Sequence, residues 1–309
     1  MAFYDSTESH LYSVYFAPRG ANRMFELGAK ISQLHLSPFD HIIGIIGEAG
    51  AGKSMLIKGM FPGLELTNDD AGVNIRPLPL LSQDDESVFY QPHTYHVDIR
   101  FEAAFTQMFE LADAVMQAKK RGRRVVVEHY ELIYPYMREA ADLIVGIGEE
   151  IIVTRPSIFG PEPDEVHQIV YNSIRYRQMA HTAEDLCERH LKPEDMGKAV
   201  HGDVKKGFLL MFKGYKPDVD LDEMERGVIE DIKKGMPVSF VDESHVMIGE
   251  EKHYCTGPRT HVKNTNLIQD FHLVKPMIYD KAHDTWIICG RVCPDPENLK
   301  IKALNNLEI

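Results

Sequence analysis

The sequence lacks the features that would place this protein in a membrane or in an oxidising compartment. No apolar run approaches the ~18 residues that a transmembrane helix requires, and the longest runs, such as 208–212, have the length of a strand. The first ten residues have neither the basic start nor the apolar core of a secretory signal. We therefore expect a cytoplasmic protein with no membrane partner. Its few cysteines should be reduced thiols or metal ligands, and these are Cys187, Cys255, Cys289 and Cys293.

An excess of basic charge is also missing. The formal net charge is −13, and acidic residues outnumber basic ones in both halves of the chain. This balance excludes promiscuous binding to nucleic acid but leaves a specific RNA contact open, because phosphate contacts need only a few clustered cations. The length of 309 residues favours about two domains.

The first part of the chain alternates apolar runs with amphipathic segments and glycine-rich turns. This alternation is typical of an α/β domain, which we predict for residues 1–178. Residues 101–121 form one long amphipathic pattern with a basic end, which predicts a single helix. The other predicted helices are 21–35 and 55–60, and the predicted strands are 41–47, 64–67, 124–128 and 143–154.

The pattern of predicted helices and strands changes after residue 178. A helix is predicted to begin near His181 and another to span 222–234. Helices followed by a run of strands indicate an α+β domain, which we predict for residues 179–309. The predicted strand segments are 237–248, 252–256, 268–280 and 285–292.

One stretch matches the phosphate-binding pattern G-x-x-x-x-G-K-[ST], between a predicted buried strand and a predicted helix. Glycines let backbone N–H groups curl around a phosphate chain, and a helix N-terminus adds partial positive charge. Lys53 would reach the β- and γ-phosphates of ATP, and the Ser54 hydroxyl would bind Mg²⁺. The predicted nucleotide-binding residues are Gly47, Glu48, Ala49, Gly50, Ala51, Gly52, Lys53 and Ser54.

Acidic residues at predicted strand ends are candidates for the chemistry. Asp69 and Asp70 follow the predicted strand 64–67, and Glu128 ends the apolar run 124–128. Acidic groups at the carboxyl ends of strands face the phosphates in open α/β sheets. The alternatives are an Asx turn for the aspartates and a solvent carboxylate for Glu128. The segment from Gly47 through the aspartate pair resembles HPr kinase-like proteins, which implies that one aspartate is a base or a Mg²⁺ partner. Glu128 resembles an acidic residue in a Walker B position.

The second half contains a candidate metal site. His181 and Asp185 lie four residues apart, so both can point from one face of a helix toward one ion. Cys255 and His261 would complete a tetrahedral set of two nitrogens, one oxygen and one sulfur, which suits Zn²⁺. One alternative is that His181 and Cys255 only pack. Another is a structural site made from residues near the chain end, namely His253, Cys255, Cys289 and Cys293.

These positions resemble the editing domain of alanyl- and threonyl-tRNA synthetases and of freestanding alanyl-tRNA editing proteins. Residues 181–185 (HTAED) match the start of the family's H-x-x-x-H helix, and residues 255–265 (CTGPRTHVKNT) match its cysteine–histidine loop and V-x-N-T stretch. The sequence departs from the family twice. Asp185 stands where a histidine is expected, and two extra residues separate Cys255 from His261. The resemblance implies a partner that is an aminoacyl-tRNA or a small aminoacyl or nucleoside ligand.

Three functions follow. The first is an ATP-binding phosphotransferase or ATPase whose C-terminal domain recognises an aminoacyl group, a nucleoside or a tRNA end. The second is a metal-dependent hydrolase of mischarged aminoacyl-tRNA regulated by ATP. The third is a nucleotide-binding regulator without turnover. The sequence favours the first, because the phosphate motif is complete whereas the editing ligands are altered, and it leaves the oligomeric state open.

Overall fold

The computed structural model describes residues 12–67, 78–82, 93–137, 139–294 and 304–305. Contacts divide the chain into unit 1, which comprises Met1–Ala17 and Ala21–Asn172, and unit 2, which comprises Pro18–Gly20 and Ser173–Ile309. One helix, α6 (Pro163–Arg189), contributes residues to both units. The prediction that a helix begins near His181 is therefore wrong. The helix begins at Pro163, because the first helical position is one where proline costs no hydrogen bond.

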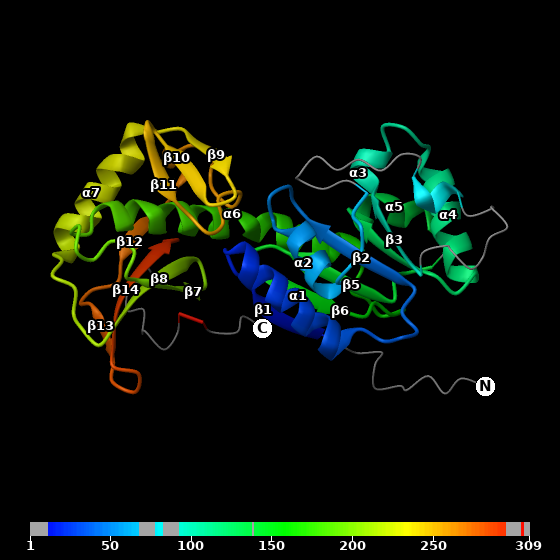
Figure 1. Cartoon of the computed structure of the whole chain (residues 1–309), viewed down its shortest axis with the longest axis horizontal. Helices are drawn as coiled ribbons and strands as arrows, with labels where there is room; N and C mark the ends of the chain where they lie inside the picture. The colour runs from blue at the N-terminus through cyan, green and yellow to red at the C-terminus, as the bar shows by residue number, and fades with distance from the viewer. Residues whose placement is uncertain (1–11, 68–77, 83–92, 138, 295–303, 306–309) are drawn as a thin grey trace. The chain divides into compact units, whose positions relative to one another are not determined.

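Unit 1 is built around a six-stranded sheet in the order β1-β6-β5-β2-β4-β3 (Figure 1). The four strands β5, β2, β4 and β3 are parallel. β6 pairs antiparallel with β5, and the edge strand β1 pairs antiparallel with β6. Parallel strands are buried on both faces, which explains their continuous apolar runs. The strands are β1 (Tyr12–Phe16), β2 (Ile42–Gly47), β3 (Thr94–Asp98), β4 (Arg124–Glu128), β5 (Leu143–Ile147) and β6 (Glu150–Thr154).

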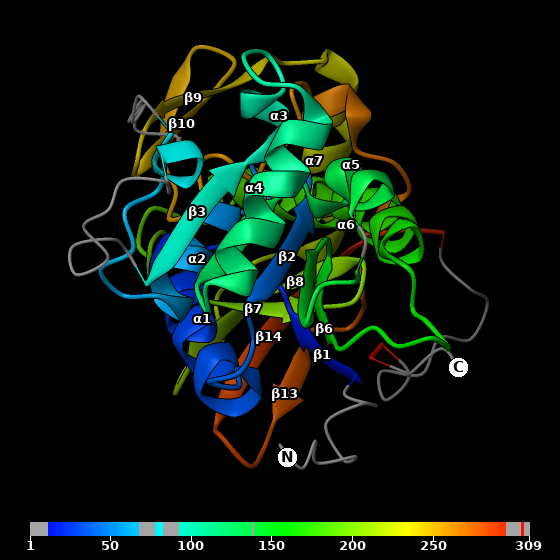
Figure 2. The same cartoon turned by 90° about the vertical axis from the view of Figure 1, so that its right-hand side faces the viewer.

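Helices cover both faces of this sheet (Figures 1 and 2). Ile42 and Ile46 of β2 pack in the core formed with α4, α5 and the start of α6. Ile43 and Ile45, which alternate with them, are also completely buried, and α1 and α2 pack together on that side. The helices of unit 1 before α6 are α1 (Ala21–His35), α2 (Lys53–Met60), α3 (Ile99–Glu102), α4 (Met108–Lys120) and α5 (Tyr130–Ile133), with short 3-10 segments η2 (Pro79–Ser82) and η3 (Tyr134–Tyr136).

Three predicted elements of unit 1 differ from the structure. Residues 64–66 have no regular structure and Thr67 lies in a bend, so the predicted strand 64–67 does not form. The predicted helix 101–121 is divided into α3 and α4, because residues 103–107 leave the helix and Gln107 caps α4. The predicted strand 143–154 is a hairpin of β5 and β6 that reverses at Gly148 and Glu149. The predicted helix 21–35 and the strand 124–128 are confirmed.

The described residues of unit 2 form two antiparallel sheets and two α-helical segments, the second part of α6 and α7 (Leu221–Lys234). The larger sheet has the order β12-β14-β8-β7, with β13 also paired to β14, and the smaller has the order β11-β10-β9. The strands are β7 (Val200–Val204), β8 (Gly207–Lys213), β9 (Val238–Asp242), β10 (His245–Ile248), β11 (Glu251–Tyr254), β12 (Phe271–Leu273), β13 (Ile278–Asp280) and β14 (Thr285–Val292), and the 3-10 segment η4 is Thr265–Leu267.

Local sequence explains the limits of α7, whose predicted span is confirmed. The Asp220 carboxylate accepts the backbone N–H groups of Asp222 and Glu223 at 2.8 and 3.2 Å, and such an N-cap contributes about 1 kcal/mol. The helix ends at Gly235, whose φ of 64° favours glycine. In β14, Trp286 packs against Tyr279 with ring centroids 4.8 Å apart, and the Lys216 ammonium lies 5.0 Å from the indole.

Candidate functional site

The glycine loop (residues 47–54) connects β2 to α2 in unit 1. Gly50 and Gly52 have φ values of 78° and 94°, a region that disfavours any residue with a Cβ. Gly52 is the residue before the first turn of α2, and Lys53 begins the helix. The predicted strand–loop–helix arrangement around residues 47–54 is therefore present, with the N-terminal N–H groups of α2 next to the loop.

Lys53 lies between the glycine loop and the end of a neighbouring strand. Its Nζ donates to the Glu48 carbonyl at 3.1 Å and lies 3.7 Å from Oε2 of Glu128. Both side chains are more than nine-tenths buried. β4 is the parallel neighbour of β2, and Glu128 pairs in register with Ile45. The structure thus brings the predicted lysine and the predicted acidic residue together.

His96 fixes the orientation of Glu128. The Thr67 backbone N–H donates to Nδ1 of His96 at 3.1 Å, so this nitrogen is an acceptor and the ring proton is on Nε2. Nε2 then donates to Oε1 of Glu128 at 2.9 Å. Burial raises the pKa of Glu128, but the His96 hydrogen bond and the nearby Lys53 charge outweigh burial, and the pKa is lowered. Glu128 is therefore held as a carboxylate.

Asp98 is an acidic residue that the sequence interpretation missed. It ends β3 in register with Glu128, and single ligand atoms of Asp98, Glu128 and His129 lie within 4.8 Å of one another. One Asp98 oxygen also accepts the Phe101 N–H at 3.1 Å as the N-cap of α3. The sequence signal for Asp98 was weaker than that for Glu128, because Asp98 follows a mixed polar and apolar stretch (94–97, TYHV) whereas Glu128 follows three valines. Asp69 and Asp70 lie outside the described residues, so their predicted role stays a prediction.

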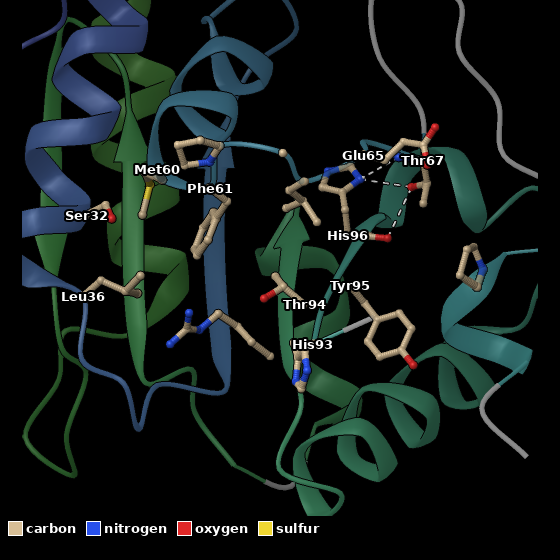
Figure 3. A pocket seen from close by; sticks show the side chains of 15 residues that line it. Ser32, Leu36, Met60, Phe61, Glu65, Thr67, His93, Thr94, Tyr95 and His96 are labelled. Atoms are coloured by element: carbon tan, nitrogen blue, oxygen red, sulfur yellow. Dashed lines mark hydrogen bonds between the residues drawn. The ribbon is translucent and has the colours of Figure 1, made fainter. Parts of the chain in front are cut away.

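A cavity of about 640 Å³ lies along β3 and the end of α2 (Figure 3). His96 and Thr67 form part of its wall, and their hydrogen bonds are drawn in the figure. Phe61 and Tyr95 add aromatic surface, and Glu65 adds a carboxylate. His96 therefore both lines the cavity and positions Glu128.

The second site is the four-residue cluster in unit 2, formed by His181, Asp185, Cys255 and His261. Its ligand atoms all lie within 4.8 Å of one another. Cys255 Sγ is 3.3 Å from Nε2 of His181 and 3.3 Å from Nε2 of His261, and the latter nitrogen is 3.6 Å from Oδ2 of Asp185. The structure thus brings the four predicted metal ligands together despite the longer spacing between Cys255 and His261.

Hydrogen bonds on the far side of each ring determine which histidine nitrogens face the cluster. Nδ1 of His181 donates to the Thr260 carbonyl at 3.1 Å, so its Nε2 is unprotonated. The Thr182 hydroxyl donates to the Gln178 carbonyl at 3.0 Å. It therefore accepts from Nδ1 of His261 at 3.2 Å, and the Nε2 of His261 is unprotonated as well. Both rings present lone pairs to Cys255.

Burial dominates the electrostatics of the four-residue cluster. It lowers the pKa of His181 well below the ordinary value and lowers that of His261 to about 3. It raises the pKa of Asp185 to about 8 and also raises that of Cys255. Oδ2 of Asp185 is buried without a hydrogen-bond partner among the described residues. Two lone pairs, a sulfur and a carboxylate oxygen in one buried space are a donor set that fits a zinc ion.

The alternative site with Cys289 and Cys293 does not form. Among the described residues, the groups able to hold a metal contain neither of these cysteines. Cys289 instead packs with Val204 and Leu304. His253 does approach another group, the carboxylates of Asp185 and Glu188 on α6. The sequence interpretation missed Glu188 as a neighbour of that group.

Comparisons with known proteins identify no family. No family model matches the chain, and no curated protein matches its sequence. Among solved structures, the ornithine aminotransferase from Toxoplasma gondii ME49 aligns with 84% of this chain and 69% of its own at 10% identity, with a TM-score of 0.24. That score is too low to support an argument about fold or function. In the described part of the chain, no helix has both the length and the apolar character of a membrane span.

Proposed function

We propose that unit 1 is a P-loop domain that binds ATP with Mg²⁺ and transfers the terminal phosphoryl group. The observation that supports this most is the position of Lys53, buried at the junction of β2, the glycine loop and α2, 3.7 Å from the carboxylate of Glu128. A buried cation beside backbone N–H groups suits a phosphate chain. The carboxylate beside it suits a divalent cation or an acceptor proton.

The residues of unit 1 have distinct roles in this proposal. The N–H groups of the glycine loop hold the phosphates, and Lys53 neutralises charge on the β- and γ-phosphates. Ser54 and the carboxylates of Glu128 and Asp98 would hold Mg²⁺, which supplies charge neutralisation at the transferring group. Glu128 also orients the acceptor hydroxyl or water, and His96 holds Glu128 in place.

Binding of ATP and GTP with and without Mg²⁺ tests this proposal. Lys53→Ala should lower phosphoryl transfer by roughly 100- to 1,000-fold, because it removes a preorganised charge from the transferring group. Lys58→Ala, later on the same helix, is the matched control and should retain nucleotide binding. Absence of Mg²⁺-dependent nucleotide binding by the unaltered protein, or unchanged binding by Lys53→Ala, would overturn the proposal.

The four-residue cluster favours a second function in unit 2. We propose that it holds Zn²⁺ in a domain related to tRNA editing domains, which recognises an aminoacyl ester or a nucleoside. Zinc bound there would polarise a carbonyl or lower the pKa of water. The donor set supports this proposal, because both histidines present unprotonated Nε2 atoms to Cys255. A protein that binds both ligands without turnover is the alternative if neither site hydrolyses or transfers.

Elemental analysis and an aminoacyl-tRNA hydrolysis assay test the zinc proposal. Cys255→Ser should lose stoichiometric zinc, whereas Cys289→Ser, also buried but outside the cluster, should retain it. A metal-free unaltered protein would refute the site. No disulfide joins the four cysteines, all of which lie among the described residues, and this supports a reducing, cytoplasmic location for both activities.

A further inference from the structure

A second group of metal-binding side chains adjoins the four-residue cluster. Asp185 and Glu188 lie three residues apart on α6, and His253 approaches them from β11. Nε2 of His253 lies 3.8 Å from Oδ1 of Asp185 and 3.6 Å from Oε2 of Glu188. One ligand atom from each of the three residues lies within 4.8 Å of the others. Two carboxylates and an imidazole therefore converge on one point.

These distances are those of long ion pairs between His253 and the two carboxylates. Both exceed the range of a hydrogen bond, and the buried Nε2 of His253 has no hydrogen-bond partner among the described residues. Oδ2 of Asp185, in a side chain only 2% exposed, also has none. Ligands that share one ion at about 2.0–2.2 Å lie about 3.3–3.6 Å apart in a tetrahedral site. The separations here are close to those of ligands around an ion.

The neighbouring carboxylate of Glu184 has other partners. Glu184, on the same face of α6, lies 3.3 Å from the Arg19 guanidinium. His201 lies 3.1 Å from Oε1 of Glu188, which leaves Oε2 facing His253. Asp185 is paired with neither Arg19 nor His201 among the described ion pairs. Its carboxyl group is buried between two histidine-containing groups.

The two oxygens of Asp185 face different groups. Oδ2 lies 3.6 Å from His261, in the four-residue cluster, and Oδ1 lies 3.8 Å from His253. A carboxylate can bridge two ions, whereas an imidazole at the same place would offer one nitrogen to one ion. An aspartate at position 185 can therefore bind two ions at once, whereas a histidine there would bind one.

We propose that Asp185, Glu188 and His253 form a second divalent-cation site, in which Asp185 bridges to the zinc of the four-residue cluster. This inference rests on the proposed zinc site and extends it to a two-metal centre. One imidazole and two carboxylates suit Zn²⁺ or Mn²⁺. Three protein ligands leave coordination positions open, so the substrate class is an ester or amide whose carbonyl oxygen reaches the second ion. Two-metal sites of this kind are used for hydrolysis.

The test is the metal stoichiometry of the full chain. Metal is removed with a chelator, and the protein is titrated with Co²⁺ and separately with Zn²⁺ under equilibrium dialysis. We expect two equivalents. One Co²⁺ should give a thiolate charge-transfer band, because the four-residue cluster contains Cys255, and the other should not.

His253→Gln should bind one equivalent and keep the thiolate band, and Glu188→Gln should do the same. His245→Gln is the matched control, because His245 lies on β10 of the same small sheet and hydrogen-bonds Asp242; it should bind two equivalents. Circular dichroism checks that each variant is folded. One equivalent in the unaltered protein, or two in both His253→Gln and Glu188→Gln, would overturn the second site while leaving the zinc proposal intact. No bound metal would overturn both.

Discussion

The two units build their sites in opposite ways. The site in unit 1 is dominated by eight consecutive residues whose backbone forms a loop between a strand and a helix. The site in unit 2 is assembled from side chains far apart in the sequence, since Cys255 and His181 are separated by 74 positions. A contiguous backbone site can be recognised from spacing alone. A site of distant side chains depends on how α6 packs against the segment after β11.

The charges of the two sites also differ. Unit 1 places a buried ammonium, Lys53, beside its loop and so suits an anion. Unit 2 places lone pairs and the carboxylate of Asp185 together without a lysine or arginine contact to that carboxylate among the described ion pairs, and so suits a cation. Each unit should therefore respond to its own ligand, and the predictions below test this separation.

The largest effect should come from the ligands themselves. Zn²⁺ at 1,000 times its dissociation constant should raise the free energy of unfolding of unit 2 by about 4 kcal/mol, because only the folded unit assembles the four ligands. Mg²⁺ with ATP should stabilise unit 1 in the same way. Hydrogen exchange read by mass spectrometry distinguishes the units. If either ligand protected both units equally, the sites would not be separate.

The next largest effect is expected when the carboxylate of Glu128 is removed. Glu128→Gln should reduce phosphoryl transfer by roughly 100- to 1,000-fold, since it removes the group that accepts or orients the proton. Nucleotide affinity should change much less, because Lys53 and the glycine loop remain. Steady-state kinetics beside equilibrium binding measure the two effects. Glu139→Gln, at an exposed carboxylate, serves as the control. Equal losses in affinity and turnover would assign Glu128 to binding alone.

His96 should have a smaller effect, because it acts through Glu128. His96→Phe should lower turnover by about 10- to 100-fold, as expected for a residue that orients a catalytic group. The lost hydrogen bond should also raise the pKa of Glu128, so the acidic limb of the rate profile should move to higher pH. His96→Gln keeps a donor and should recover part of the rate. A profile that does not move in His96→Phe would refute this positioning role.

The smallest effect concerns the stability of unit 2 in acid. Burial raises the pKa of Asp231, but hydrogen bonds from Lys234 at 2.7 Å and His190 at 2.9 Å outweigh it, and the pKa is lowered. Asp231 therefore contributes stability above its unfolded pKa of 3.8, and this contribution is lost as the pH falls through the lower folded value.

Asp231→Asn should destabilise unit 2 by about 1–3 kcal/mol near pH 6, where a charged hydrogen-bond acceptor is lost, and by less in acid. Urea unfolding followed by circular dichroism at several pH values measures the difference. Glu230→Gln, exposed on the same helix, should show no such pH dependence. A penalty independent of pH would show that the charge of Asp231 is unimportant.

Local patterns predicted the elements that depend on neighbouring residues. The apolar run of β2, the glycine loop after it and the capped helix α7 follow from short-range rules, and their predictions agree with the structure. The errors arose where a local pattern allowed two outcomes. Residues 143–154 contain two apolar runs, and the turn signal of Gly148, Glu149 and Glu150 between them was overlooked. Pro163 begins a helix although proline also marks loops.

The candidate sites show the same division. Lys53 could be predicted because its motif fixes its place, whereas Asp98 and His96 lie on a strand whose neighbour, β4, is defined only by the folded sheet. His181 and Asp185 could be paired from helical spacing. That these two residues lie near Cys255 could be predicted only from the resemblance to a known family. That His253 lies beside Glu188 could be seen only in the structure.

Trp286 offers a way to observe one unit at a time. It is the only tryptophan in the sequence, and it lies in unit 2, between Tyr279 and Lys216. Fluorescence excited at the red edge of the absorption spectrum therefore reports on unit 2 alone, while tyrosines in unit 1 remain dark. A melting curve recorded by this emission isolates unit 2 optically. The midpoint of this curve identifies the calorimetric transition of the intact chain that belongs to unit 2, and the remaining transition is then assigned to unit 1.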